Sequence, residues 1–150
     1  MKKKIALFLA AAMTVSALPM TAFASTTNTV SKIATVETDD KYTSTIVLDE
    51  FKGMTETNEK QTIKLTLVGS EFQDAQFEKT TADDNGVTWT KIGDKEAFAT
   101  FTAPNNDTDT VKLAIKATAK DEGDSTVTIE ATDAVVSAQT LKIANVQGGA

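Results

Sequence analysis

Apolar and polar side chains alternate at every second position in several stretches of this chain, and this pattern limits its possible folds more than any other feature. In the clearest stretch the apolar positions are Val111, Leu113, Ile115 and Ala117, with Lys112 and Lys116 between them. Successive side chains of a β-strand point to opposite faces of the sheet, whereas a helix repeats about every 3.6 residues. The pattern therefore predicts a strand that buries one face and exposes the other.

Two further stretches, residues 63–67 and 127–131, alternate in the same way. Less regular candidate strands are residues 30–36, 42–48, 87–92, 97–102 and 140–146. Clusters of Asp, Asn, Gly and Pro, which are typical of turns, separate them. Threonine favours strands because it is β-branched, and it accounts for 24 of the 126 residues after position 24. We predict an all-β domain, an antiparallel β-sandwich of about eight or nine strands, with a barrel as the second choice.

Two segments leave their structure open at this point. Residues 72–77 are compatible with a strand or with a short turn of helix, and we favour the strand. Residues 133–139 are compatible with a short helix or with a loop. Neither segment has enough regular alternation to decide between the two readings.

The N-terminal segment predicts export. Lysines at positions 2–4 precede an uncharged, mostly apolar run, and Ala22 and Ala24 stand three and one positions before Ser25. This order is that of a secretory signal peptide. A membrane anchor is the alternative, but a spanning helix needs roughly 20 apolar residues and Pro19 interrupts this run. The expected division is a signal peptide over 1–24, a flexible lead-in over 25–29, the sandwich domain over 30–146 and a tail over 147–150.

Composition restricts the chemistry of the expected mature part. Loss of the three N-terminal lysines takes the net charge from −6 to −9, and all basic residues are lysines. This balance disfavours nucleic acids and anionic membrane surfaces as partners, since both attract basic patches. The sequence has no Cys and no His, so it offers no disulfide and no Ser–His or Cys–His nucleophile. We expect no catalytic residues and no enzyme activity.

Acidic loops raise the question of calcium, which takes oxygen ligands. An EF-hand register that places Gly86 sixth has Thr81 first and Ile92 last, so both terminal carboxylates are missing. A register that begins at Asn105 places Lys116 last and fails as well. The densest remaining cluster is Asp121, Glu122 and Asp124. We expect these acids to form turns and expect no cofactor, with Ca²⁺ kept as the alternative.

Three further groups of residues bear on binding or covalent chemistry: the acids, the aromatic rings and one Lys–Asn pair. Paired carboxylates can hydrolyse glycosides, but nothing in the sequence pairs two of the many acids here. Sugar-binding faces need exposed rings; we expect Trp89 in the core, and Tyr42 is the ring that an exposed face would use. Lys32 and Asn145 lie in the first and last candidate strands, a spacing that permits a covalent crosslink without requiring one.

The chain also resembles a family of secreted proteins. The residues that carry the likeness are Ile63–Leu67, Glu71-Phe72, Gly86–Trp89, Val111–Thr118 and Ser125–Ala131. They are similar to the N-terminal β-sandwich region of Gram-positive "copper amine oxidase N-terminal (stalk) domain-containing" surface proteins. The resemblance implies an immunoglobulin-like or cohesin-like sandwich at the front of a surface or matrix protein. It does not imply oxidase activity, because that enzyme needs three copper-binding histidines and this chain has none.

These observations predict a secreted, non-catalytic β-sandwich that acts as an extracellular structural or interaction module, at the cell surface or in the matrix. The expected partners are a cell-wall polymer, another surface protein or further copies of the chain. The alternative function is an extracellular ligand-binding module for a polysaccharide or Ca²⁺. The edge strands are where self-association would begin, since an unpaired edge carries free backbone donors and acceptors.

Overall fold

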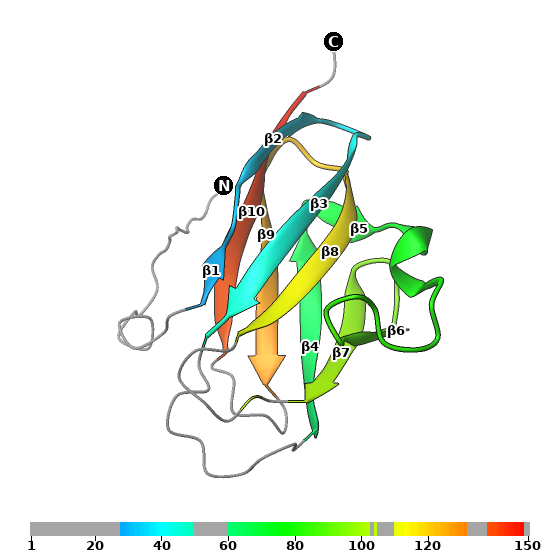
Figure 1. The fold of residues 1–150 in the computed structure, drawn as a ribbon. Helices are drawn as coiled ribbons and strands as arrows, with labels where there is room; N and C mark the ends of the chain where they lie inside the picture. Colours follow the sequence, from blue (N-terminus) through cyan, green and yellow to red (C-terminus); the bar gives the residue numbers. More distant parts are fainter. Residues whose placement is uncertain (1–27, 50–59, 103, 105–109, 132–137, 149–150) are drawn as a thin grey trace.

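The computed structural model describes residues 28–49, 60–102, 104, 110–131 and 138–148, which form two β-sheets packed face to face (Figure 1). The strands are β1 (Thr29–Val30), β2 (Ala34–Glu37), β3 (Lys41–Leu48), β4 (Lys60–Val68), β5 (Ser70–Phe72), β6 (Thr88–Lys91), β7 (Glu96–Thr102), β8 (Val111–Ala119), β9 (Gly123–Ala131) and β10 (Gln139–Gln147). One 3₁₀ helix, η1 (Asp74–Phe77), follows β5. No helix within these residues has the length and apolar character needed to cross a lipid bilayer.

The small sheet has the order β1-β3-β8-β5, and the large sheet has the order β2-β10-β9-β4-β7-β6. The predicted β-sandwich is therefore confirmed, although the described residues contain ten strands. All neighbouring strands are antiparallel except β2 and β10, which run parallel. The predicted antiparallel arrangement therefore describes the sandwich except at this one edge of the large sheet.

The alternation that predicts the strands also sets the inner faces of both sheets. On β8, Leu113 and Ile115 are fully buried at 0% exposure, whereas Lys112 and Lys116 are exposed. Leu113 lies opposite Ile46 of β3, which is also fully buried. The large sheet contributes Ile63, Leu65, Leu67, Val127 and Ile129 to the same core. Burial of these aliphatic side chains between the sheets is the main stabilising contribution to this fold.

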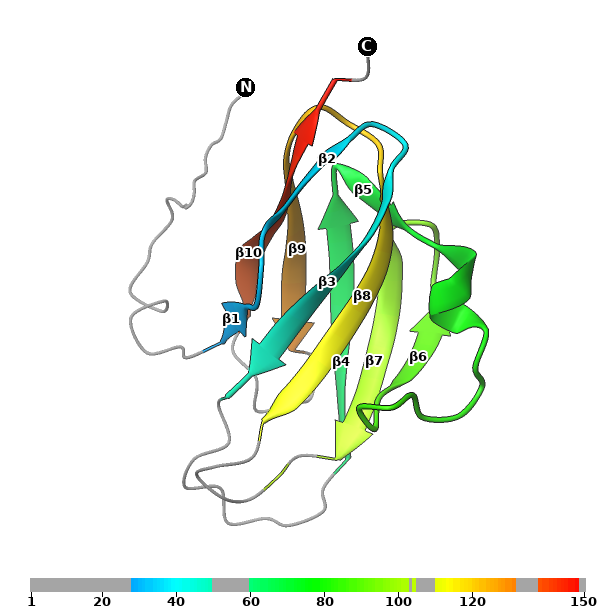
Figure 2. The ribbon, with the colours of Figure 1, turned by 45° about the horizontal axis from the view of Figure 1, so that its top comes forward.

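The candidate strand over residues 30–36 is divided in the structure. Thr29 and Val30 pair with β3 in the small sheet, whereas residues 34–37 pair with β10 in the large sheet (Figure 2). Residues 31–33 between them are exposed, and the chain passes there from one sheet to the other. A β-rich stretch of sequence predicts strand conformation, but it does not predict a change of sheet within that stretch.

The preference for a strand over residues 72–77 is wrong beyond Phe72. The chain turns into η1 there, and two glutamine side chains bond to backbone groups of β8. Gln73 Nε2 donates to the carbonyl oxygen of Ala117 (2.8 Å), and Gln76 Nε2 donates to that of Ala114 (3.2 Å). The Phe77 ring then packs edge-on against Phe72, with their centroids 5.7 Å apart.

A cluster of hydroxyl groups joins the two sheets inside the core. The Tyr42 hydroxyl of β3 lies 2.6 Å from Ser70 Oγ of β5 and donates to Ser125 Oγ of β9 (3.2 Å). Ser70 and Ser125 lie 2.7 Å apart, and Ser125 Oγ donates to the Val68 carbonyl oxygen (3.1 Å). Tyr42 is 8% exposed, so the suggestion that its ring could be exposed is wrong. Each buried hydroxyl here has partners, which offsets the cost of its desolvation.

Gly69 brings the two sheets close together beside this cluster. Its φ of +88° lies in the left-handed region, and a Cβ there would lie 3.2 Å from the Asp124 carbonyl oxygen. Its own carbonyl oxygen accepts hydrogen bonds from the backbone N–H groups of Lys120 and Asp121. Only glycine combines this backbone conformation with so close a contact.

Replacement of Leu113 tests the core. Leu113→Ala removes buried methyl groups and leaves a cavity, so we expect a loss of roughly 2–5 kcal/mol in the free energy of unfolding. Lys112→Ala, on the opposite face of the same strand, should change it by less than about 0.5 kcal/mol. Urea titrations of both variants measure the difference. Equal destabilisation of the two would contradict the assignment of the faces of β8.

Ser44 gives a second test, because its hydroxyl is buried without a hydrogen-bond partner among the described residues. Ser44→Ala should raise the free energy of unfolding by roughly 1 kcal/mol, since it removes an unsatisfied polar group. Ser125→Ala makes the same chemical change but removes hydrogen bonds, so it should lower that energy by roughly 1–3 kcal/mol. Thermal or urea unfolding distinguishes the signs, and a loss of stability in Ser44→Ala would refute this account.

Candidate interaction surfaces

Asp83 organises the loop before β6 and holds Trp89 in the core. Its Oδ1 accepts hydrogen bonds from the backbone N–H groups of Asn85 (2.8 Å) and Val87 (3.0 Å). Its Oδ2 accepts one from Trp89 Nε1 (3.0 Å), and Trp89 is only 6% exposed. The expectation that Trp89 packs in the core is confirmed. The acidic turn over residues 83–86 thus has a structural task.

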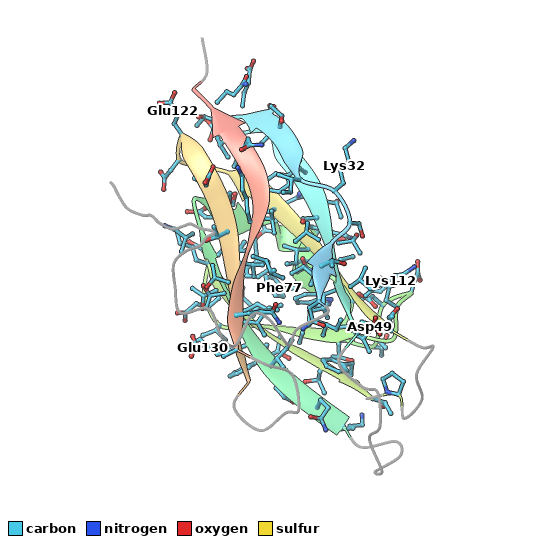
Figure 3. The ribbon with its side chains drawn as sticks, turned by 90° about the vertical axis from the view of Figure 1, so that its left-hand side faces the viewer. Lys32, Asp49, Phe77, Lys112, Glu122 and Glu130 are labelled. Carbon is cyan, nitrogen blue, oxygen red and sulfur yellow. The ribbon has the colours of Figure 1, made fainter. Side chains whose placement is uncertain are left out.

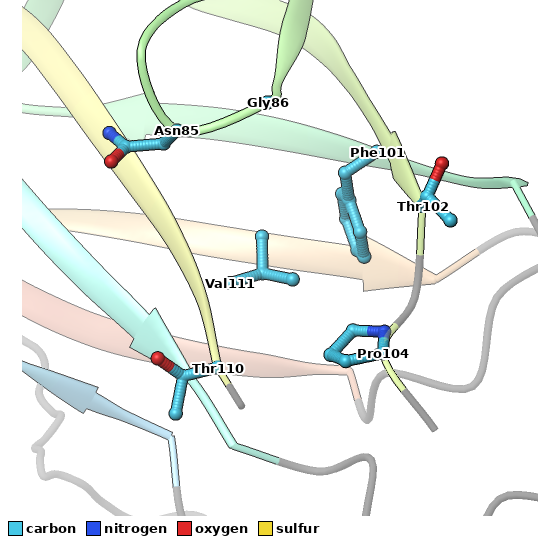
Figure 4. Close-up of a pocket in the computed structure, with 7 residues that line it drawn as sticks. All are labelled: Asn85, Gly86, Phe101, Thr102, Pro104, Thr110 and Val111. Carbon is cyan, nitrogen blue, oxygen red and sulfur yellow. The ribbon is translucent and has the colours of Figure 1, made fainter. Parts of the chain in front are cut away.

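A pocket lies where this loop faces the ends of β7 and β8 (Figure 4). Its volume is about 560 Å³. The residues that line it are Asn85, Gly86, Phe101, Thr102, Pro104, Thr110 and Val111. Phe101, Pro104 and Val111 contribute apolar surface, and Asn85, Thr102 and Thr110 contribute polar surface. None of the described residues that line it has an ionisable side chain.

The outer face of the large sheet carries threonines on five of its strands, most of them half-buried. We call it the threonine face, and its threonines are Thr62 and Thr66 (β4), Thr88 and Thr90 (β6), Thr100 (β7), Thr126 and Thr128 (β9) and Thr140 (β10). Thr62 and Thr100 bond to each other through their hydroxyls (3.1 Å), as do Thr128 and Thr140 (3.0 Å). Half-buried Phe98 lies in this face, between Lys64 and Thr90 on the neighbouring strands.

The charges on the threonine face are largely paired. Lys64 Nζ lies 3.7 Å from Glu96 Oε2, and Lys142 Nζ lies 3.0 Å from Asp124 Oδ1 at its margin. Glu130 lies opposite Lys64 on the adjacent strand. The face therefore combines threonines, the half-buried Phe98 ring and, at the two ends of β4, exposed Lys60 and Val68. Lys60 has no acidic group within 4.0 Å among the described residues, whereas the charges nearer the centre are paired or opposed.

The outer face of the small sheet differs, because it carries unpaired lysines. Lys41 of β3 and Lys112 and Lys116 of β8 are exposed, and none has an acidic group within 4.0 Å among the described residues. Lys112 and Lys116 are four positions apart on one strand and share its outer side. In a chain whose net charge is −6, this is a local concentration of positive charge.

The three acids considered for calcium occupy separate positions. Glu122 Oε2 accepts a hydrogen bond from the Gly148 N–H (3.2 Å), at the end of the sandwich near the C-terminus (Figure 3). Asp124 forms the ion pair with Lys142, and Asp121 contributes its backbone N–H to Gly69. Within the part of the chain that the structure describes, no three acidic side chains gather to hold a metal ion.

The two residues considered for a crosslink are also placed apart in the fold. Lys32 is exposed in the connection between β1 and β2, outside any strand (Figure 3). Asn145 lies within β10, opposite Thr35 on one side and Asp124 on the other. Lys32 therefore lacks the buried strand position that the crosslink hypothesis assumed.

Comparisons with known proteins give matches among solved structures only. No protein-family model matches the chain, and no curated protein matches its sequence.

Three solved structures are similar to it at low sequence identity. The seventh ScaB type I cohesin of Pseudobacteroides cellulosolvens is 10% identical, with a TM-score of 0.48 over 82% of this chain and 94% of that chain. ACE19, the collagen-binding subdomain of the Enterococcus faecalis surface protein ACE, is 9% identical, with a TM-score of 0.45 over 79% and 95%. A type III cohesin module of the Ruminococcus flavefaciens ScaE scaffoldin is 8% identical, with a TM-score of 0.44 over 91% and 96%. At these values a shared partner or function does not follow, and the fold assignment depends on the two sheets themselves.

Sequence reasoning missed the threonine face, although the signal was present. The threonines stand at the polar positions of the same alternating stretches that predict the strands, for example Thr66 in residues 63–67 and Thr128 in residues 127–131. No such signal exists for the pocket or for residues 111–115 of β8, which have no neighbouring strand on the β5 side among the described residues. Both features depend on which strands are neighbours in the fold.

Removal of the Asp83 carboxylate tests the structural account of its loop. Asp83→Ala takes away the acceptor of two backbone N–H groups and of Trp89 Nε1, so we expect a loss of roughly 1–3 kcal/mol in unfolding free energy. Trp89 should also become more accessible to acrylamide in fluorescence quenching. Asp84→Ala is the matched control, since Asp84 is exposed and makes only a surface ion pair with Lys79. Equal quenching in both variants would contradict this role of Asp83.

Proposed function

We propose that this protein is a secreted, non-catalytic β-sandwich that acts as an extracellular interaction module and binds a partner protein through its threonine face. The observation that carries the proposal is the composition of that face. It combines threonine hydroxyls, a half-buried phenylalanine and paired charges over five neighbouring strands of the large sheet. The cores of protein interfaces are depleted in charge and enriched in aromatic residues.

The rigidity of the face supports the same proposal. Its strands are held from behind by the buried aliphatic core, and the hydroxyl cluster of Tyr42, Ser70 and Ser125 ties the two sheets together. A face that is already ordered loses little conformational entropy when a partner binds to it. Binding through such a face requires neither a conformational change nor a cofactor.

The location outside the cell depends on the predicted signal peptide over residues 1–24. An acidic mature domain without cysteine suits that location, because it remains soluble and does not require an oxidant to fold.

Polysaccharide binding is a less favoured alternative. The two rings that sequence reasoning considered for a sugar platform, Trp89 and Tyr42, are both buried. Phe98 is a single, half-buried ring, and one ring does not form a stacking platform for consecutive sugars.

Charge placed in the threonine face tests the proposal. Thr128→Lys adds an unpaired charge to the centre of the face, where a docked partner would bury it, so we expect partner binding to fall at least tenfold. Thr43→Lys adds the same charge to the outer face of the small sheet and serves as the control. Both variants should keep melting temperatures close to that of the parent chain.

The measurement requires the partner to be captured first. A photo-crosslinking benzoylphenylalanine replaces Phe98 in the full chain, with the same group at Thr43 as the control. Irradiation of the protein with intact producing cells or their secreted proteins should give one specific adduct from position 98. Binding of the identified partner to Thr128→Lys and Thr43→Lys is then compared. Equal adducts from positions 98 and 43, or equal loss of binding in both variants, would overturn the proposal.

A further inference from the structure

The edge of β8 is free over its first half. The backbone groups of odd residues on β8 face β3, since Ala119 N–H donates to the carbonyl oxygen of Asp40. Those of even residues face β5, since Gln73 N–H donates to the carbonyl oxygen of Lys116. β5 ends at Phe72, which lies opposite Ala117, so no strand of the described residues pairs with residues 111–115 on that side. Within the part of the chain that the structure describes, the small sheet therefore has an open edge beside the pocket.

The side-chain amide of Gln76 already bonds to two backbone groups of this edge, as a neighbouring strand would. Gln76 Nε2 donates to the Ala114 carbonyl oxygen (3.2 Å), and Gln76 Oε1 accepts from the Lys116 N–H (2.6 Å). This amide pairs with β8 as a backbone amide would. Beyond it, the N–H of Ala114 and both backbone groups of Lys112 have no partner among the described residues.

The pocket adjoins this free edge on the inner side of the sheet. Thr110 and Val111 line it from β8, and Phe101 and Pro104 line it from the end of β7 and the residues after it (Figure 4). Side chains of an added strand would alternate between the inner and the outer side of the small sheet. An inner side chain would point towards the pocket, whose volume is about 560 Å³. The pocket is open and its lining is mixed, so an aliphatic or aromatic group would contact Phe101, Pro104 and Val111, while Thr102, Thr110 and Asn85 stay available to polar groups.

The outer side of the same edge selects for negative charge. An outward side chain of an added strand would lie next to Lys112, because directly opposed residues on neighbouring strands have Cβ atoms about 5 Å apart. The edge beside Lys116 is already occupied by Gln73 and Gln76, so Lys116 adds positive charge nearby without a directly opposed residue. Both lysines lack an ion-pair partner among the described residues. A carboxylate opposite Lys112 would give a favourable cross-strand pair.

We propose that the edge of β8 over residues 110–114 binds an extended segment of a partner protein as an added strand. The segment places an apolar side chain in the pocket and an acidic side chain beside Lys112. Main-chain hydrogen bonds supply affinity, and the alternating side chains supply specificity, as in other strand-addition complexes. This site is separate from the threonine face, so either proposal can fail without the other.

A synthetic peptide, acetyl-Glu-Val-Glu-Leu-Glu-Val-Glu-amide, serves as the probe for the isotopically labelled protein. Its addition should shift the backbone amide NMR signals of Lys112 and Ala114 and those of the pocket residues, in a saturable manner. The signal of Thr128 on the threonine face should stay unchanged. Absence of binding, or shifts outside the edge and the pocket, would overturn the proposal.

N-methylated peptides test the backbone pairing directly. In one peptide every Glu amide nitrogen is methylated, and in the other every Val and Leu amide nitrogen is methylated. A strand directs alternate N–H groups to opposite edges, so one of the two peptides should lose binding and the other should keep it. Equal affinities of the two peptides would exclude strand addition.

Charge reversal tests the selectivity for acids. Lys112→Glu should raise the Kd of the peptide about tenfold, whereas Lys95→Glu, at an exposed lysine of the β6–β7 turn, should leave it within about twofold. A second copy of the chain could occupy the edge of β8 in place of a partner segment. Sedimentation equilibrium of the protein alone shows whether it forms dimers. Dimers that dissociate in the Lys112→Glu variant would assign the edge to self-association and overturn the proposed partner segment.

Discussion

Side chains on a β-strand alternate between two faces, so each residue that a strand contributes to the core places its neighbours on the surface. In this sandwich the constraint acts on both sheets at once, because the aliphatic inner faces must be buried against each other without a disulfide to assist them. The outer positions are then free to vary, and the chain uses them differently. Threonines occupy outer positions on both sheets, but the small sheet adds three exposed lysines, Lys41, Lys112 and Lys116, that have no ion-pair partner among the described residues. The two surfaces therefore differ in chemistry although one core holds both.

Alternation in the sequence predicts the strands that have one buried face, and β4, β8 and β9 fall where it places them. It fails where the chain leaves a sheet or where side chains replace backbone partners. Residues 31–33 pass between sheets, and after β5 the side-chain amide of Gln76 takes the place of a backbone amide beside β8. Neither event depends on the hydrophobic pattern. Tyr42 shows a further limit, since a polar ring is buried here only because hydroxyls from two other strands meet it.

The candidate sites differ in how far sequence could predict them. The threonine face follows from the pattern that gives the strands, because its members are the polar half of each alternating stretch. The free edge of β8 does not, since it depends on β5 being three residues long and on η1 turning away after it. The acids at positions 121, 122 and 124 attract attention in the sequence, yet their separate contacts with Gly69, Gly148 and Lys142 explain them as parts of turns and margins.

An open strand edge is a hazard for a secreted protein, because it can pair with the same edge of another copy. The strands at the other sheet edges are short: β1 has two residues, and β2 and β6 have four each. β8 is long, but Lys112 and Lys116 stand on its outer side. When two copies of β8 pair edge to edge, their lysines come close to one another, and like charges on neighbouring strands repel. The same lysines attract a strand that carries carboxylates, so the charges that oppose pairing between copies also favour an acidic partner.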